Sequence, residues 1–223
     1  MASQSFLIGV AGPSGAGKSY LARHLAGRLH SPVLSLDHYY RDLSHLSFDE
    51  RASSNFDEPA ALEHELLIEQ VAELHEGRTI AVPTYDFSVH TRTSQTQVFQ
   101  PAAFVIIEGL FTLHWEELRR LLGTSVYVEM VDDVCLQRRT ERDVHERGRT
   151  PESVIAQFRA TVAPMAERYV KPTLRHADVV LPGSLPIDEG VARVLEHVRR
   201  QARDHNMKPA LDYLSSLEPT SAY

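Results

Sequence analysis

The chain has 223 residues, a formal net charge of −7 and 43% hydrophobic residues, which suits one α/β domain with a substantial core. This acidic balance argues against a general nucleic-acid binder, which normally carries a basic surface. Cys135 is the only cysteine, so no intrachain disulfide can form. This fits the reducing environment of the cytoplasm, where we expect the protein to lie. We expect neither a signal peptide nor a membrane span, because the longest apolar stretch, around residues 102–107, is too short.

Short apolar runs alternate with helical patterns along the chain. The runs lack polar alternation, as buried parallel strands do, and they cover residues 6–11, 33–36, 104–107, 126–130 and 179–181. Helices are expected over residues 17–29, 59–76, 134–145 and 151–170, followed by an amphipathic helix that starts near residue 187. The alternation predicts an α/β fold with a doubly wound parallel sheet, flanked by helices, that binds its ligand at the carboxyl ends of the strands.

Two segments depart from this alternation. Residues 78–100 contain two short apolar stretches around a polar one, which predicts a β-hairpin inserted beside the core. Residues 204–223 are weakly patterned, so we expect a C-terminal tail that is partly disordered. A single domain is therefore expected over residues 1–203.

A phosphate-binding loop follows the first apolar run. Its sequence matches the complete GxxxxGK[ST] pattern between an expected strand and an expected helix. The glycines let backbone N–H groups turn toward phosphate oxygens, and the helix adds the positive end of its dipole. Lys18 is placed to reach the β- and γ-phosphates, and the Ser19 hydroxyl to ligate Mg²⁺. The residues predicted to bind the nucleotide are Gly12, Pro13, Ser14, Gly15, Ala16, Gly17, Lys18 and Ser19.

Two acidic residues stand where other apolar runs end. Asp37 follows the second run, where a carboxylate can take a proton from an attacking hydroxyl; the plainer alternative is that it caps a turn. Glu108 follows the third run and is predicted to hold Mg²⁺ together with Ser19; the plainer alternative is an exposed turn acid.

Five arginines lie between positions 138 and 149 of this acidic chain. Planar guanidinium groups suit phosphate oxygens and stabilise the charge on a transferring phosphoryl group. We expect residues 138–150 to form a lid, with Arg142 and Arg149 acting in catalysis and Arg147 on the nucleotide. Arg138 is expected on a solvated helix face with the acids Glu141, Asp143 and Glu146.

Five strings in chain order, together with the phosphate loop, resemble the uridine–cytidine kinase family, which is related to phosphoribulokinase. They lie at residues 35–40 (SLDHYY), 55–59 (NFDEP), 83–92 (PTYDF with His90 and Arg92), 106–109 (IIEG) and 139–149. The resemblance covers residues 6 to about 182. It implies phosphorylation of a nucleoside 5′-hydroxyl with ATP or GTP and Mg²⁺, and a homotetramer.

The resemblance also implies roles for matching residues. Asp37 would be the general base for the ribose 5′-hydroxyl, and Asp57 would accept from the ribose hydroxyls beside Arg139. Tyr85 and His90 would recognise the pyrimidine, although His90 read alone is an ordinary loop histidine. The further residues of the pocket would be Tyr40, Gln157 and Phe56, the last of which read alone is a core residue.

Other readings stay open at this point. Gly183 and Ser184 stand where the family tends to have a basic residue and then glycine. The sequence therefore leaves open whether this loop contacts the nucleotide. A phosphoribulokinase-like kinase for another small molecule is one alternative, although a sugar phosphate would call for extra cations around residues 55–59 and 85–90. A nucleotide-dependent switch is another, although the Asn-Lys-x-Asp motif of a GTPase is missing from the sequence. The choices between uridine and cytidine and between ATP and GTP are open as well.

Overall fold

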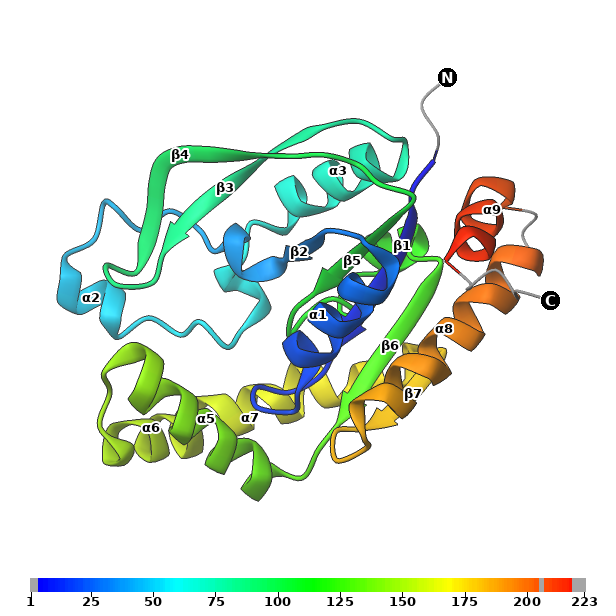
Figure 1. The fold of residues 1–223 in the computed structure, drawn as a ribbon. Coiled ribbons are helices and arrows are strands. Elements are labelled where there is room, and N and C mark those ends of the chain that lie inside the picture. Colours follow the sequence, from blue (N-terminus) through cyan, green and yellow to red (C-terminus); the bar gives the residue numbers. More distant parts are fainter. Residues whose placement is uncertain (1–3, 205–206, 218–223) are drawn as a thin grey trace.

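The computed structural model describes residues 4–204 and 207–217, arranged around a parallel sheet (Figure 1). The sheet has five strands in the order β2-β5-β1-β6-β7. Their bounds are β1 (Phe6–Ala11), β2 (Val33–Ser35), β5 (Phe104–Glu108), β6 (Thr124–Glu129) and β7 (Val179–Pro182). Each predicted apolar run therefore forms one strand, and the predicted α/β fold is confirmed.

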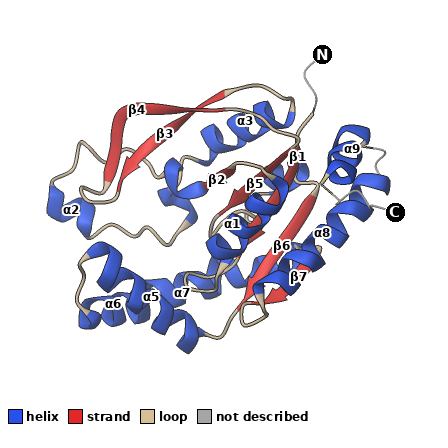
Figure 2. Cartoon of the chain, in the orientation of Figure 1, coloured by secondary structure: helices blue, strands red, loops and turns tan. Residues whose placement is uncertain are grey.

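Helices cover both faces of the sheet, which explains the continuous apolar strands (Figure 2). Phe6 and Ile8 of β1 point to one core cluster, and Leu7 points to the other. The first cluster contains side chains of α1 (Lys18–Leu29), α8 (Ile187–Asp204) and α9 (Lys208–Ser216). The second contains side chains of α3 (His64–His75) and α4 (Glu116–Leu121). Within the described ranges, no helix has both the length and the apolar composition of a membrane span.

The remaining helices lie around the carboxyl end of the sheet. They are α2 (Phe48–Ala52), α5 (Asp132–Arg147), α6 (Pro151–Gln157) and α7 (Ala163–Met165). Helical turns with π geometry, Phe158–Val162 and Ala166–Val170, flank α7 on either side, so the predicted helix over residues 151–170 is present in segments.

The strands β3 (Ile80–Asp86) and β4 (Thr91–Phe99) form a separate antiparallel pair, as predicted for residues 78–100. Ile80, Val82 and Tyr85 are buried in the second core cluster, whereas most of β4 is exposed. The turn between the strands reaches toward the carboxyl end of the central sheet (Figure 1).

The predicted helix over residues 59–76 begins later than expected. Pro59–Ala61 forms a short 3₁₀ turn, Leu62 is extended, and α3 starts at His64. Leu62 forms an antiparallel bridge with Tyr40, and the backbone N–H of Glu63 donates to the Tyr39 carbonyl at 2.9 Å. This pairing uses backbone groups that a longer helix would need.

Part of the C-terminal segment, for which we expected a partly disordered tail, forms a helix. Residues 208–216 form α9, in which Ala210 and Leu214 are buried. The Tyr213 hydroxyl donates a 2.7 Å hydrogen bond to the Leu29 carbonyl, and its ring packs against Phe104. The helical spacing of these side chains gives one face that docks on the core. Residues 205–206 and 218–223 of the predicted tail lie outside the described residues.

Candidate active site

The phosphate loop joins β1 to α1 and packs directly on the start of α5. Gly15 has a φ of 87°, and a Cβ atom there would lie 2.4 Å from the Cys135 carbonyl oxygen, so only glycine fits. Gly17, with a φ of 106°, stands immediately before α1. The loop therefore has the shape of an anion cradle, and it ends at the positive end of a helix dipole.

Glu108 connects the phosphate loop to the neighbouring strand. Its Oε2 accepts a hydrogen bond from Ser19 Oγ at 3.0 Å, and its Oε1 accepts one from Ser35 Oγ at 2.9 Å. Glu108 is only 8% exposed, so it is not the exposed turn acid of the alternative interpretation. The arrangement places a hydroxyl and a carboxylate oxygen together beside the loop, and Mg²⁺ prefers such oxygen ligands.

No cluster of three or more His, Cys, Asp or Glu side chains suited to a metal occurs among the residues with described positions. A Mg²⁺ at a phosphate site keeps several waters and takes phosphate oxygens as ligands, so it needs few protein ligands. Ser19 and Glu108 are the side chains that would hold it.

Asp37 lies in the 3₁₀ turn Leu36–Tyr39 that follows β2. Ser35 Oγ accepts from the Asp37 backbone N–H, so Ser35 caps this turn and the Asp37 carboxylate does not. Burial and the Glu108 carboxylate raise the pKa of Asp37, and the Lys18 ammonium opposes that shift. Burial lowers the pKa of Lys18, while the carboxylates of Glu108 and Asp37 raise it. The three charged groups thus form one electrostatic unit at the phosphate loop.

A cavity of about 990 Å³, which we call the large cavity, collects the predicted residues from separate parts of the chain. Every residue predicted to bind substrate lines it, namely Tyr40, Phe56, Asp57, Tyr85, His90, Arg139 and Gln157. The predicted catalytic, metal and lid residues line it as well: Lys18, Ser19, Asp37, Glu108, Arg142, Arg147 and Arg149. Of the phosphate loop, Ser14 also faces this cavity.

Aromatic rings form one end of the large cavity. The rings of Phe56 and His90 are stacked, with centroids 5.7 Å apart, and Tyr40 meets Phe56 edge to face at 5.3 Å. The buried Tyr85 hydroxyl has no hydrogen-bond partner among the described residues, and burial raises the pKa of Tyr85 to about 12. Burial and nearby arginines lower the pKa of His90, so its ring is neutral at pH 7. This end therefore offers a flat apolar wall with neutral hydrogen-bonding groups.

A buried ion pair lies between the aromatic end and the phosphate loop. Arg139 Nη1 is 3.9 Å from Asp57 Oδ1, and it donates a 2.9 Å hydrogen bond to Ser14 Oγ. Gln157 Oε1 accepts from Arg139 at 3.2 Å and from Arg149 at 2.6 Å. Burial raises the pKa of Asp57, and the Arg139 guanidinium opposes this shift. These contacts connect α5 and α6 to the phosphate loop.

The solvated helix face expected for Arg138 is wrong. Arg138 Nη1 donates to the carbonyls of Ala16 and Gly183, both at 3.3 Å. Asp143, which we expected among solvated acids, has no exposed surface. The signal that sequence reasoning missed is spacing: Cys135, Arg139 and Asp143 recur every four residues, so all three lie on the buried face of α5.

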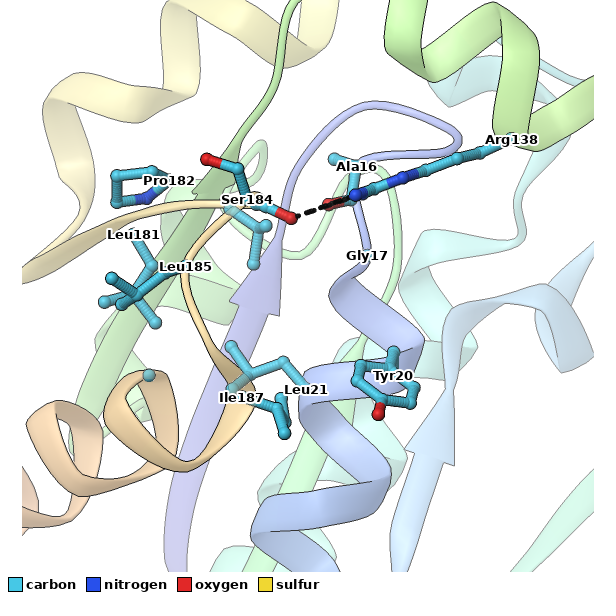
Figure 3. Close-up of a pocket in the computed structure, with 13 residues that line it drawn as sticks. Ala16, Gly17, Tyr20, Leu21, Arg138, Leu181, Pro182, Ser184, Leu185 and Ile187 are labelled. Carbon is cyan, nitrogen blue, oxygen red and sulfur yellow. Dashed lines mark hydrogen bonds between the residues drawn. The ribbon is translucent and has the colours of Figure 1, made fainter.

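A smaller cavity of about 410 Å³ lies against the same phosphate loop (Figure 3). Arg138 extends across it from α5, the segment of residues 181–185 forms one side, and Tyr20 of α1 forms another. A Cβ atom at Gly183 would lie 2.3 Å from the Ala16 carbonyl oxygen, so the glycine allows this close approach. Ala16 and Gly17 line the small cavity, whereas Ser14 and Lys18 line the large one, which places the loop between the two.

Comparisons with known proteins agree with this geometry. The profile of the Phosphoribulokinase / Uridine kinase family matches residues 7–187. A uridine kinase of Staphylococcus epidermidis is 43% identical over 183 residues, which cover 81% of this chain and 88% of that protein. A uridine kinase of Aliivibrio fischeri is 42% identical over 183 residues, which cover 79% and 85%.

Among solved structures, phosphoribulokinase from Rhodobacter spheroides has the same fold, with a TM-score of 0.58 at 18% identity over 82% of this chain and 74% of that one. The match to the family profile and the identity to two uridine kinases agree with the strand–loop–helix phosphate site and its parallel sheet. The chain therefore belongs to the phosphoribulokinase/uridine kinase family of P-loop kinases.

Proposed function

We propose that this protein transfers the γ-phosphoryl group of ATP or GTP to the 5′-hydroxyl of uridine or cytidine. The observation that carries the proposal is the large cavity, which has the Asp37 carboxylate beside the phosphate loop and an aromatic wall at its other end. The relatives named uridine kinase support it, since they are 42–43% identical over most of this chain.

The nucleoside would bind with its base at the aromatic end and its ribose near the ion pair. Phe56 offers an apolar face for the base, and a neutral His90 has one donor and one acceptor, which suit either the 4-amino or the 4-oxo group. The unpartnered Tyr85 hydroxyl would make a further hydrogen bond. Asp57 would accept from the ribose hydroxyls while Arg139 holds its carboxylate in place. Tyr40 and Gln157 would complete the walls.

Phosphoryl transfer would take place at the phosphate-loop end. Asp37 would accept the proton of the 5′-hydroxyl while the hydroxyl oxygen forms a bond to the γ-phosphorus. The bond between the γ-phosphorus and the β–γ bridging oxygen would break, and the bridging oxygen would leave with the nucleoside diphosphate. Lys18, Arg142 and Arg149 would stabilise the charge on the transferring group, and Arg147 would contact the donor phosphates. A bound Mg²⁺, held by Ser19 and Glu108, would neutralise phosphate charge.

The small cavity would hold the base of the donor nucleotide. It adjoins the phosphate loop at Ala16 and Gly17, and its volume of about 410 Å³ suits a nucleobase. Tyr20, Arg138 and Ser184 supply its polar and planar groups. The Gly183-Ser184 loop would thus contact the donor even though it lacks the basic residue that the family tends to have.

A panel of nucleosides tests the proposal. The purified chain is incubated with Mg²⁺ and ATP or GTP and with uridine, cytidine, adenosine or guanosine, and product is identified as the 5′-monophosphate by ³¹P NMR. We expect uridine and cytidine to be phosphorylated and the two purine nucleosides to be excluded. The Lys18→Ala variant is the control, because it should lose both donor affinity and turnover. Turnover of purine nucleosides only, or of no nucleoside, would contradict the proposal.

A further inference from the structure

Asp143 lies at the centre of a cluster of arginines at the C-terminal end of α5. Its side chain has no exposed surface. Arg142 donates to Oδ1 through Nε at 2.9 Å and lies within 2.7 Å of it through Nη2. Three further guanidinium groups lie within 4.0 Å of the carboxylate, those of Arg139 (3.5 Å), Arg149 (3.6 Å) and Arg147 (3.7 Å). One buried carboxylate therefore contacts the four arginines that line the large cavity.

The backbone of Asp143 holds the same segment. Its carbonyl oxygen accepts the N–H of Gly148, which ends α5 with a φ of 62°, and the N–H of Arg149 at 3.1 Å. This turn carries Arg147 and Arg149 back toward the helix. Asp143 thus fixes both the turn that presents two of the arginines and the guanidinium groups themselves.

The charges within the cluster do not cancel. A buried carboxylate is costly unless it is paired, and here it is surrounded by cations. Asp143, together with Asp57 beside Arg139, places two negative charges against four guanidinium groups, so the cluster itself keeps positive charge, although the carboxylates of Asp37, Glu108 and Glu146 also line this cavity. Asp143 does not itself line the large cavity, so it touches no ligand there and acts on one through the arginines and through its own charge.

We propose that Asp143 is a positioning residue, which holds these arginines in the geometry that phosphoryl transfer requires. This inference rests on the proposed kinase function. Asp143 aligns the guanidinium groups before the donor binds, and the excess positive charge of the cluster is left for the phosphates. The carboxylate therefore contributes to the transition state through geometry, while it weakens the net attraction of the cluster for an anion.

The Asp143→Asn variant separates these two effects, because it keeps the size of the side chain and removes its charge. We expect kcat to fall about a hundredfold, the cost of a displaced catalytic group. The dissociation constant for ATP, measured by calorimetry, should stay equal or decrease because net positive charge rises. Glu141→Gln is the matched control, since it removes an exposed carboxylate from the same helix; its kcat should equal that of the native protein.

A double variant shows whether Asp143 acts through the arginines. In an Arg142→Ala background, adding Asp143→Asn should lower kcat by much less than a hundredfold, because the group that it positions is gone. A general loss of folded protein would instead multiply the two losses. Arginine Nε–Hε NMR signals give a readout without turnover: the Arg142 signal should be protected from exchange in the native protein and in Glu141→Gln, and lose protection in Asp143→Asn.

Two results would overturn the inference: a native kcat in folded Asp143→Asn, or losses that multiply fully in the double variant. Failure of the proposed function looks different, because the native protein itself would then not phosphorylate uridine or cytidine. In that case the Arg142 signal and ATP binding still report whether Asp143 orders the cluster.

Discussion

Ser19 Oγ lies 3.0 Å from Glu108 Oε2, although the two residues are 89 positions apart. The pairing of β1 with β5 brings them together, since its register sets Val10 opposite Glu108 at the edge where the phosphate loop begins. The parallel sheet thus places the carboxylate that ends one strand beside the helix that follows another. A hydroxyl and a carboxylate held together in this way are suited to a hard cation at the nucleotide phosphates.

We expect Glu108→Gln to change the Mg²⁺ dependence of the reaction. An amide keeps the hydrogen bonds to Ser19 and Ser35 but lacks the charge, so the half-saturating Mg²⁺ concentration should rise by about 10- to 100-fold. The measurement is initial rate against Mg²⁺ concentration at saturating ATP. Glu129→Gln is the control, because Glu129 also ends a strand but is exposed. An unchanged Mg²⁺ curve for Glu108→Gln would remove Glu108 from the metal site.

The Asp37→Asn variant should lose turnover while it keeps its fold and its donor affinity. Removal of a general base costs about 10²- to 10⁴-fold in rate. Because burial and Glu108 raise the pKa of Asp37 in the folded protein, its ionised form opposes folding at neutral pH. The variant should therefore unfold at the same temperature as the native protein or at a higher one. Steady-state kinetics and thermal unfolding at pH 7.5 test this pair of outcomes; a lower melting temperature with near-native kcat would make Asp37 structural.

The raised pKa of Asp37 should also be visible in how the activity and the stability of the native enzyme depend on pH. A raised pKa means that Asp37 takes up its proton at a higher pH than an ordinary aspartate, so kcat/KM should fall on acidification from a correspondingly higher pH. The contribution of Asp37 to the free energy of unfolding has the opposite trend, since it is lost as the pH rises through the raised pKa. Rate and unfolding profiles across pH 4–8 would check both signs, with Asp37→Asn as the reference. Identical unfolding profiles for the two proteins would contradict the assignment.

The His90→Ala variant should lose activity toward pyrimidine nucleosides while it keeps its affinity for ATP. Loss of one hydrogen bond to the base, together with the stacked ring beside Phe56, should reduce kcat/KM for uridine and cytidine by about 10- to 100-fold. The affinity for ATP should not change, because the small cavity has no side chain from this hairpin. His45→Ala, which alters an exposed histidine, controls for general effects. Equal kinetics for His90→Ala and the native enzyme would show that another group recognises the base.

The C-terminal helix should stabilise the domain without taking part in the reaction. Leu214 is 4% exposed in the core cluster with α1 and α8, so Leu214→Ala should lower the free energy of unfolding by about 2–5 kcal/mol. The value of kcat at 25 °C should be unchanged, because α9 lines neither cavity. Urea denaturation measures the first and the nucleoside assay the second, with the exposed Ser215→Ala as control. Native stability in Leu214→Ala would mean that α9 does not dock in solution.

The strands, the phosphate loop and the two strand-end acids could be predicted because short-range pattern specifies them. Each buried strand is a short apolar run, because both faces of a covered parallel sheet are dry. The phosphate loop is readable because glycines at set positions, a lysine and a serine are all needed within eight residues. The positions of Asp37 and Glu108 followed from the rule that the carboxyl ends of parallel strands share one edge.

Long-range contacts instead set where the charged side chains of α5 point and where the segments flanking the core begin. Arg138 and Asp143 look like parts of a solvated helix face in the sequence, but burial depends on what packs against the helix, here the phosphate loop and the segment that carries Arg149. The start of α3 was set by a backbone bridge between Tyr40 and Leu62. These contacts join residues far apart in the chain, so the local sequence does not say which segment packs against α5, even where a spacing of four residues marks the buried face of the helix.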